Sequence, residues 1–583
     1  MADATRRGFL GTMTAMGGAA VATAVVEGAD ARADTLSRAC PPTPGMVSVG
    51  PDDPRYQDLI LRGYNARFLG NPETVHVVHS AGQVVRAVDQ AVRAGKRIVA
   101  RGGGHCFENF VDDPSAQVVI DLSQMNGVSY DPRHHAFAVE AGATLGQVYR
   151  SLYLGWGVTL PAGTCPSVGV GGHVAGGGYG LLSRRHGLVV DHLHGVEVVV
   201  VDRSGRARVV VATRERDDPH HDLWWAHTGG GGGNFGIVTR YLMRSPHATR
   251  RTGPAGLLPA PPAGILACQM SWDWARLTPS AFAGLLDNYG RWQRGPMTEP
   301  VYAGMDTTLA MPHRAGGRIG LTALLDASGP AAEEAMGRFV EAMGQGVGEP
   351  LIEVFGTAPY LRLVTSSTDA AGAFYLRSKS KCGYLRAPWT ARQVETVYRH
   401  LTEGEEDPGG AVYLNSFGGT VNKVAADATA FPHRSSSMIA FYDVGWYDPA
   451  QDDDRLAWVR RLYREVYEET GGVPVPDERN DGAYINYPDL DLADPAHNTS
   501  GTAWHALYYK DNYARLQRVK ARFDPLDLFH HGLSVRPPGA DAPVRKAAVP
   551  AGGGRLPRPE PESYARPAAP AHGVAHRILD ARR

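Results

Sequence analysis

The chain has 583 residues, of which 43% are hydrophobic, so it is long enough to bury more than one core and to form roughly two to four domains. Its formal net charge of −1 at pH 7 argues against an electrostatic nucleic-acid binder, and we expect no nucleic-acid partner. The five cysteines form no CxxC pair and are odd in number, which disfavours a disulfide framework and the common zinc and iron–sulfur sites, so we expect no bound metal.

Residues 1–33 carry the features of an export signal. Thr5-Arg6-Arg7-Gly8-Phe9-Leu10 is a twin-arginine pattern, a small and apolar stretch follows to Val26, and Ala31-Arg32-Ala33 offers a cleavage site. The stretch is too short and too rich in glycine and alanine for a stable membrane span. We therefore expect a twin-arginine signal peptide and an extracytoplasmic or secreted protein. An ordinary disordered N-terminus is the alternative.

Residues 74–243 alternate short β-branched runs with amphipathic helices. The pattern predicts strands over residues 74–80, 97–100, 118–122, 136–140 and 195–202. It also predicts a helix, one face of which carries Val84, Val85, Val88 and Val92. This is an α/β layout, and we assign residues 47–245 to a first domain.

From about residue 254 the pattern changes to long alternating runs with helices between them. It predicts strands over residues 318–327, 411–416 and 437–446, and a helix over 453–470 that Gly471 ends. We infer a second domain over residues 250–480, built on a largely antiparallel sheet with helices on one face. Residues 481–536, with a helix ending near Phe523, are expected to return to the first domain, and residues 537–583 to form a disordered tail.

Two loops of the first domain place a nucleophilic side chain beside glycines. Arg101-Gly102-Gly103-Gly104-His105 follows a predicted strand, and Cys165 precedes a glycine run over residues 169–180. Backbone without Cβ atoms lets a planar ligand lie close to the main chain, and imidazole and thiolate are side chains that can bond to it. The pair favours a large planar ligand that is bonded to the protein twice.

Two common glycine-rich nucleotide-binding motifs do not fit the glycine run. A doubly wound dinucleotide fingerprint needs G-x-G-x-x-G directly after a strand, whereas Pro161-Ala162-Gly163-Thr164-Cys165-Pro166 precedes this run. A phosphate-binding P-loop needs a G-K-[ST] ending, which does not follow. What remains is a loop whose backbone amides can meet a pyrophosphate and the edge of an isoalloxazine ring.

Five motifs in order along residues 47–536 resemble those of the berberine-bridge-enzyme-like flavin oxidases of the vanillyl-alcohol-oxidase fold. They are the two glycine loops and residues 233–238, 484–489 and 508–513. The resemblance implies an α+β fold, with an FAD-binding domain of the PCMH type and a substrate domain whose large antiparallel sheet is covered by helices. Within the family the chain looks most similar to the hexose oxidases of glycopeptide-antibiotic biosynthesis, through Arg184 and residues 224–228 and 470–476.

The resemblance implies that FAD is the cofactor and that it is bonded bicovalently, through His105 to its 8α-methyl group and through Cys165 to C6 of the same ring. One departure is Gly102, where many relatives carry serine. The further residues implied to bind the cofactor are Arg101, Gly102, Gly103, Gly104, Val168, Gly169, Gly171, Gly172, His173, Gly176, Gly177, Gly178, Gly233, Asn234, Gly236, Ile237, Val238 and Asn512.

Oxidation of an alcohol by hydride transfer also needs a base for the hydroxyl proton, and the resemblance points to Tyr487. A free tyrosine has a pKa of about 10, so this base needs a partner that favours its phenolate, and Tyr179 is the expected second phenol. A tyrosine that only packs in a loop is the alternative. Val168 matches the family position that governs oxygen access, where valine implies reoxidation by O₂ with release of H₂O₂.

Two further clusters are less informative. His220 and His221 lie beside three aspartates, but neighbouring side chains point apart and a solvated turn explains them better than a metal site. Arg377, Lys379 and Lys381 are suited to an anionic group of a substrate, and the alternation of an exposed strand edge explains them equally well.

These features together predict an FAD-dependent oxidase of an alcohol on a glycosylated natural product, with O₂ as the second substrate. The resemblance to the glycopeptide hexose oxidases implies four-electron oxidation of a sugar primary alcohol to the carboxylate. One alternative is two-electron oxidation of another secondary-metabolite hydroxyl or of an oligosaccharide, and a second is a non-catalytic flavin-binding protein. We expect a monomer or a homodimer.

Overall fold

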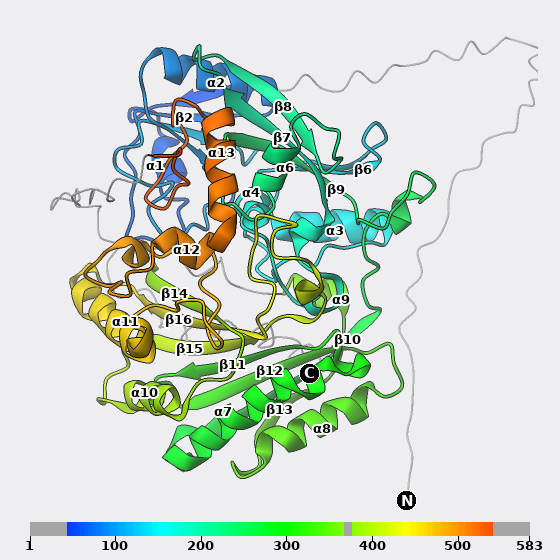
Figure 1. Cartoon of the computed structure of the whole chain (residues 1–583), viewed down its shortest axis with the longest axis vertical. Helices are drawn as coiled ribbons and strands as arrows, with labels where there is room; N and C mark the ends of the chain where they lie inside the picture. The colour runs from blue at the N-terminus through cyan, green and yellow to red at the C-terminus, as the bar shows by residue number, and fades with distance from the viewer. Residues whose placement is uncertain (1–43, 367–375, 540–583) are drawn as a thin grey trace, which may run out of the picture. The chain divides into compact units, whose positions relative to one another are not determined.

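The computed structural model describes residues 44–366 and 376–539, and these residues form three β-sheets with helices packed on them (Figure 1). The predicted signal peptide lies outside the described residues, as does the predicted tail from residue 540 onward. One continuous hydrophobic core runs from Val78 in the first sheet to Val535 near the end of the described chain. Within the described residues, no helix has the length and apolar character that a membrane crossing requires.

The first sheet has the strand order β1-β2-β4-β3, made of β1 (Val47–Val49), β2 (Thr74–Val77), β3 (Ile98–Arg101) and β4 (Val118–Asp121). β2 and β3 both pair with β4 in parallel, and helix α2 (Ala81–Arg93) connects them. Ser80 begins α2 by accepting a hydrogen bond from Gln83 N. The helix buries Val84 and Val88 as predicted, together with Ala87 and Ala91. Val85 and Val92 are partly buried and pack against the core at the edge of this face.

The second sheet is antiparallel throughout, with the order β5-β6-β9-β7-β8. Its strands are β5 (Val128–Asp131), β6 (Ala136–Glu140), β7 (Leu193–Val201), β8 (Ala207–Thr213) and β9 (Ile237–Met243). The α/β layout expected for residues 74–243 therefore holds for the first sheet only. Between β6 and β7 the chain forms α3 (Leu145–Trp156), which a Thr144–Gln147 capping box begins, and then the short helices α4 (Val170–Ala175) and α5 (Ser183–His186).

The third sheet has seven antiparallel strands in the order β13-β10-β12-β11-β15-β16-β14. They are β10 (Gly264–Asp273), β11 (Asp306–Pro312), β12 (Arg318–Asp326), β13 (Leu351–Pro359), β14 (Arg377–Leu385), β15 (Gly410–Ser416) and β16 (Met438–Trp446). Figure 1 shows α7 (Pro279–Arg294), α8 (Ala332–Gly344) and α10 (Ala391–Thr402) along one face of this sheet, with α11 (Asp452–Val466) beside them. The predicted α+β fold with a helix-covered antiparallel sheet is confirmed.

The C-terminal segment packs on the first two sheets. It contains α12 (Trp504–Tyr509) and α13 (Tyr513–Phe523), which ends at the predicted residue and lies against α6 (His221–Ala226). Arg515 places its guanidinium 4.1 Å from the ring centroid of Trp225, and Lys520 Nζ donates to Asn234 O at 2.9 Å. Residues 484–491 also meet the glycine run, since Gly178 N donates to Tyr484 Oη and Asn486 Nδ2 donates to His173 O. Two further short α-helices are α1 (Tyr56–Ile60), which follows β1, and α9 (Tyr360–Val364), which follows β13.

Candidate active site

The two glycine loops of the first domain meet backbone to backbone. A Cβ atom on Gly103 would lie 2.3 Å from Gly169 N, and a Cβ atom on Gly169 would lie 2.2 Å from Gly103 N. Either methyl group would collide with main chain, which cannot move aside as a flexible side chain can. Glycine is therefore required at both positions for the histidine loop and the cysteine loop to come together.

Ser167 lies between the two predicted attachment side chains. Its Oγ is 2.9 Å from His105 Nε2 and 3.5 Å from Cys165 Sγ. Burial lowers the pKa of His105 to about 4, so the imidazole is neutral at neutral pH and one of its ring nitrogens keeps a lone pair. The ring also stacks on Tyr64, with the two centroids 5.1 Å apart. The tertiary structure thus brings together the two nucleophiles that the sequence singled out.

The backbone beside this pair is open at Gly172. Nothing lies within 4 Å of the position that a Cβ atom would take on Gly172, and the residue is exposed. At Gly171, by contrast, a Cβ atom would lie 2.8 Å from Ala141 O. A neutral imidazole, a thiol and an uncovered stretch of glycine backbone are the groups that a doubly attached flavin needs, so these residues fit FAD.

The later glycines of the run pack against protein. Cβ atoms on Gly176, Gly177 and Gly178 would collide with the side chains of Asn486, Phe431 and His173, respectively. Gly177 and Gly178 also have φ angles of 125° and 70°, which L-residues other than glycine rarely adopt. Gly176 thus allows the C-terminal segment to approach the glycine run, Gly177 allows the approach of Phe431 from the second domain, and Gly178 packs within the run itself. Their predicted cofactor contacts stay predictions.

Other residues predicted to bind the cofactor also have protein partners. Arg101 is buried, with Nη2 3.0 Å from Asp121 Oδ2 and Nη1 3.7 Å from Asp112 Oδ1. Asn512 Nδ2 donates to the carbonyl groups of three residues between 426 and 430. Each residue thus ties its segment to another part of the chain. These contacts leave the cofactor contacts of both as predictions.

The segment over residues 233–238 leads into strand β9. Asn234 Nδ2 donates to carbonyl groups of the preceding glycines, and its Oδ1 accepts a hydrogen bond from Val535 N at 2.9 Å. Gly236 has a φ of 145°, and a Cβ atom there would lie 2.5 Å from Val199 O. Gly233 has a φ of 73°, while Ile237 and Val238 begin β9. The segment is thus a tightly packed turn, and its contact with FAD stays a prediction.

Val168 lies in the cysteine loop, where its position is fixed by the backbone. Val168 N donates to Cys165 O at 3.3 Å, and Val168 O accepts from Leu145 N at 3.0 Å. The side chain is partly buried against the main core. Backbone hydrogen bonds thus hold Val168 next to Cys165 and to the first turn of α3. Its predicted control of oxygen access to the flavin stays a prediction.

Tyr179 and Tyr487 place their hydroxyl oxygens 2.6 Å apart. Burial raises the pKa of Tyr487 to about 12, and the hydrogen bond from Tyr179 acts in the opposite direction. Burial and the neighbouring Tyr487 raise the pKa of Tyr179 well above its ordinary value. Tyr487 is therefore the phenol of the pair that ionises first, because Tyr179 can donate a hydrogen bond to its phenolate. The structure brings the two phenols into contact, and the assignment of base and partner stays a prediction.

Aromatic side chains surround the Tyr487 ring. Phe107 stacks on it, with the ring centroids 5.7 Å apart and the planes 11° from parallel, and the Phe441 ring centroid lies 4.7 Å away. Phe107 follows His105 by two positions, so the predicted flavin attachment and the predicted base are linked through one side chain. Sequence patterns did not single out Phe107, Ser167 or Phe441. Phe107 and Ser167 could have been found from the sequence, because each lies two positions after a predicted attachment residue. Phe441 lies in β16, and no sequence motif marks it as a site residue.

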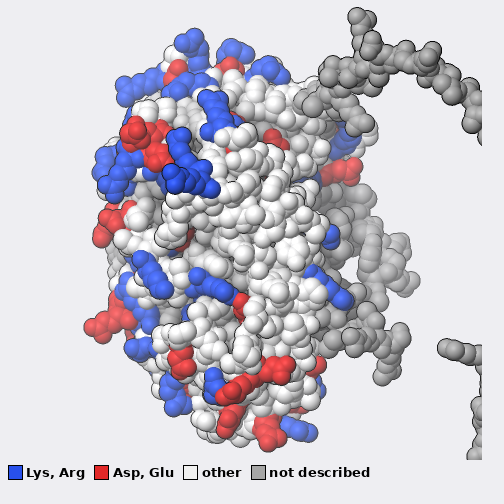
Figure 2. Space-filling view, turned by 90° about the vertical axis from the view of Figure 1, so that its right-hand side faces the viewer, with Lys and Arg blue, Asp and Glu red and all other residues white. Residues whose placement is uncertain are grey.

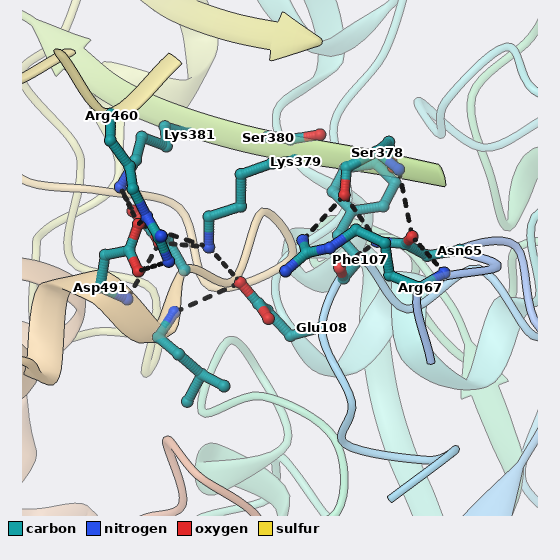
Figure 3. A network of polar contacts seen from close by, with 12 residues as sticks. Asn65, Arg67, Phe107, Glu108, Ser378, Lys379, Ser380, Lys381, Arg460 and Asp491 are labelled. Atoms are coloured by element: carbon teal, nitrogen blue, oxygen red, sulfur yellow. Dashed lines mark hydrogen bonds and ion pairs between the residues drawn. The ribbon is translucent and has the colours of Figure 1, made fainter. Parts of the chain in front are cut away.

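The two interpretations of Arg377, Lys379 and Lys381 are both wrong. β14 is an edge strand of the sheet, but α11 and residues 489–491 cover it, so that Lys379 and Lys381 are each only 2% exposed. Arg377 forms an ion pair with Asp452. All three side chains thus form ion pairs with carboxylates of the same chain. Figure 3 shows two of these carboxylates, Glu108 and Asp491.

His220 lies in a turn and precedes α6, which His221 begins. His220 N donates to Asp218 Oδ1 at 2.7 Å, and the His220 ring contacts Phe523. Among the residues that the structure describes, no group of three or more histidine, cysteine, aspartate or glutamate side chains is arranged to hold a metal ion. The face of the molecule in Figure 2 carries both lysine and arginine and aspartate and glutamate side chains, with uncharged surface between them.

Comparison with known proteins identifies related chains. Residues 72–209 match the family described as FAD binding domain, and residues 483–536 match the family described as Berberine and berberine like. Aclacinomycin-N/aclacinomycin-A oxidase of Streptomyces galilaeus is 54% identical over 542 residues, which cover 92% of this chain and 99% of that protein.

Two solved structures are similar over nearly the whole described chain. The crystal structure of aclacinomycin oxidoreductase has a TM-score of 0.82 and 54% identity, covering 85% of this chain and 100% of the other. A glycopeptide hexose oxidase complexed with teicoplanin has a TM-score of 0.82 and 50% identity, again covering 85% and 100%. The sequence motifs predicted greatest similarity to the glycopeptide hexose oxidases. The chain is instead more similar to the aclacinomycin protein, at 54% identity, than to this hexose oxidase, at 50%.

Proposed function

This chain belongs to the berberine-bridge-enzyme-like FAD-linked oxidoreductases and is an oxidase, and we propose that it oxidises an alcohol on a glycosylated natural product with O₂ as the second substrate. Two related proteins support the proposal: one is named an oxidase of aclacinomycins, and the other is a glycopeptide hexose oxidase complexed with teicoplanin. The alternative of a non-catalytic flavin-binding protein does not fit relatives that are oxidases and match nearly the whole chain.

We further propose that FAD, which accepts the hydride of the substrate when bound, is attached through both His105 and Cys165. The contacts of Ser167 with both side chains support a double attachment, because they place the imidazole and the thiol at one site. The depressed pKa of His105 supports it too, since a neutral imidazole is the form that can bond to carbon. The remaining predicted glycine contacts would hold the rest of the cofactor.

The observation that carries the proposed chemistry is the hydroxyl pair of Tyr179 and Tyr487 beside the histidine loop. Tyr487 accepts the proton of the substrate hydroxyl as the hydride leaves the carbon. Tyr179 donates a hydrogen bond to the Tyr487 oxygen and so stabilises its phenolate. Phe107 and Phe441 hold the Tyr487 ring and limit the water around it, which strengthens that hydrogen bond.

For the extent of oxidation we propose conversion of a sugar primary alcohol to the carboxylate in two rounds. The first round removes a hydride and a proton from the CH₂OH group and gives an aldehyde. Water adds to the aldehyde, and the second round removes a hydride and a proton from the hydrate to give the acid. Each round consumes one O₂ and releases one H₂O₂. Two-electron oxidation of another hydroxyl is the second candidate, because a related protein is named an oxidase of aclacinomycins.

Mass spectrometry of substrates tests this function. The purified holoenzyme is incubated with teicoplanin-type and aclacinomycin-type glycosides while H₂O₂ is measured. Loss of two hydrogens indicates two-electron oxidation, and gain of one oxygen with loss of two hydrogens indicates four-electron oxidation. No change in any glycoside would rule out the proposed substrate class.

The Tyr487→Phe variant tests the catalytic assignment. It should retain bound FAD and lose flavin reduction by the substrate. Tyr289→Phe is the matched control, because Tyr289 is buried and its hydroxyl bonds to Thr307 and Leu414 within the third sheet. That variant should reduce its flavin normally. Normal flavin reduction in Tyr487→Phe would contradict the assignment.

We also propose that residues 1–33 direct the folded protein to export by the twin-arginine route. This route accepts folded proteins and therefore suits one that takes up FAD before it leaves the cytoplasm. Replacing Arg6 and Arg7 together by lysine should retain the protein in the cytoplasmic fraction. Unchanged secretion of this variant would exclude the twin-arginine route.

A further inference from the structure

Strand β14 carries two buried lysines whose ammonium groups meet carboxylates from two distant segments. Lys379 Nζ contacts Glu108 Oε1 and lies 2.7 Å from Asp489 Oδ1. Lys381 Nζ lies 2.6 Å from Asp489 Oδ2 and 2.8 Å from Asp491 Oδ2. Figure 3 shows Lys379 extending from the strand between Glu108 on one side and Asp491 on the other. We call these five residues, together with Arg460, the lysine–carboxylate cluster.

The cluster pairs lysine and arginine side chains with carboxylates in the protein interior. Arg460 of α11 contacts both carboxylate oxygens of Asp491, at 2.8 and 2.9 Å, so three cations face three carboxylates. Burial alone would lower the pKa of Lys379, but Asp489, Asp491 and Glu108 together raise it above its ordinary value. The cations likewise hold the pKa of Asp491 well below its ordinary value against the effect of burial. Removing one member would leave a buried charge uncompensated.

Both segments that supply the carboxylates also carry the candidate active site. Glu108 lies three positions after His105, and Asp489 lies two positions after Tyr487. Phe107, between His105 and Glu108, stacks on the Tyr487 ring. The Lys379 ammonium group therefore contacts both the histidine loop, at Glu108, and the tyrosine loop, at Asp489. Both contacts lie within two residues of the Phe107–Tyr487 stack that joins the two loops.

A second set of contacts ties the histidine loop to the same strand. Asn65 Nδ2 donates to Phe107 O and to Ser378 O, both at 2.9 Å, and Asn65 Oδ1 accepts from Ser378 N at 3.1 Å (Figure 3). Ser378 adjoins Lys379 in β14. The histidine loop is thus held at Phe107 by amide hydrogen bonds and at Glu108 by charge, so its position follows that of the strand.

We propose that Lys379 is a positioning residue that fixes the loop of His105 against the loop of Tyr487 by holding Glu108 and Asp489 together. The inference rests on the proposed function, since it takes His105 as a flavin attachment and Tyr487 as the base. It assigns to the third sheet a role in setting the position of the base relative to the attachment site. It also explains why charged residues lie two positions apart on an edge strand that is buried.

Hydrogen exchange tests the positioning directly, whether or not the enzyme turns over. Peptides covering residues 103–110 and 484–491 of the holoenzyme are followed by mass spectrometry in Lys379→Met. Exchange should rise by at least about tenfold in both segments, because the two loops lose the buried ammonium group that joins them. Arg377→Gln is the matched control: it removes from the same strand an ion pair with Asp452 and a hydrogen bond to Ala66 O, and neither partner lies in residues 103–110 or 484–491. It should leave both segments protected.

Kinetics separates positioning from stability alone. A displacement of about 1 Å of a reacting group can cost about 10²-fold in rate, so kcat of Lys379→Met should fall by about that factor while KM changes by less than about threefold. Arg377→Gln should keep kcat even though it loses an ion pair. The nearly isosteric Glu108→Gln serves where Lys379→Met does not fold, and it should raise exchange in residues 103–110 and lower kcat to a smaller extent.

The outcomes distinguish this inference from the proposed function. Unchanged exchange in both segments of folded Lys379→Met and Glu108→Gln proteins would overturn the positioning role, as would an equal effect of Arg377→Gln. Normal flavin reduction in Tyr487→Phe would instead remove the proposed base, while raised exchange in Lys379→Met would still show that Lys379 holds the two loops.

Discussion

The hydroxyl oxygens of Tyr179 and Tyr487 lie 2.6 Å apart although 308 positions separate the two residues in the chain. Two neighbouring contacts fix this approach: Gly178 N donates to Tyr484 Oη at 3.0 Å, and Asn486 Nδ2 donates to His173 O at 2.9 Å. The glycine run and the C-terminal segment are thus locked together on both sides of the phenol pair. The relative position of the two hydroxyls is thus set by contacts within the folded chain.

Replacing Tyr179 with phenylalanine should weaken the base without removing it. The phenolate of Tyr487 then loses its hydrogen-bond donor, so the pKa of Tyr487 rises further above its ordinary value. We expect the rate of flavin reduction to fall by roughly 10²-fold at neutral pH and the pH profile of kcat/KM to move to higher pH. Stopped-flow reduction across a pH series measures both effects. An unshifted profile would mean that Tyr179 does not assist Tyr487.

Single replacement of His105 or Cys165 by alanine should leave FAD attached through the other residue. Loss of both should release the cofactor when the protein is precipitated with acid, which the colour of the pellet and supernatant reports. Cys106→Ala is the matched control, because burial raises the pKa of Cys106 to about 12 and its thiol stays protonated. That variant should keep both bonds. Release of FAD from either single variant would contradict a double attachment.

Alanine at Gly103 or Gly169 should prevent the two loops from meeting. The added methyl group would lie within 2.3 Å of main-chain nitrogen in either case, so we expect a loss of roughly 1–3 kcal/mol or more in the free energy of unfolding and poor cofactor incorporation. Gly155→Ala in α3 is the control of equal chemistry, since nothing lies within 4 Å of its Cβ position and the residue lies in neither loop. Thermal unfolding and the flavin-to-protein absorbance ratio compare the three variants, and equal behaviour would refute the steric argument.

The protein should lose stability as the pH falls below about 6.5. Burial lowers the pKa of His531 to about 3, and its ring nitrogens bond to Gly232 O and Leu533 N. Because the folded-state pKa lies below that of the unfolded chain, the unfolded chain binds the proton first, and stability declines from about pH 6.5 towards pH 3.

One such group contributes at most about 1.4 kcal/mol per pH unit in this window. Urea unfolding at pH 5 and pH 7 should therefore show a smaller difference for His531→Asn than for the unaltered chain. Burial also lowers the pKa of His173 and His227 to about 4, so part of the decline should remain in the variant. An unchanged difference between the two pH values would show that His531 does not titrate as described.

Local patterns in the sequence were sufficient for much of the fold. Strands β12 and β16 and helix α13 follow from alternation and helical periodicity, which depend on a few neighbouring residues. His105, Cys165, Tyr179 and Tyr487 could be singled out because each lies in a short motif. The structure adds to these residues their mutual contacts through Ser167 and the phenol pair.

The tertiary structure decided what the sequence pattern left open or indicated wrongly. The alternation of Lys379 and Lys381 is the same for an exposed edge and for a buried strand, and only the folded chain brings Glu108, Asp489 and Asp491 to them. Likewise, Gly176 is explained by Asn486, which lies far along the chain. The sequence by itself determined the residue types, the local elements and the motifs, because these depend on neighbours in the chain. Which charges are buried together and which glycines face protein depends on contacts between distant segments, and those exist only after folding.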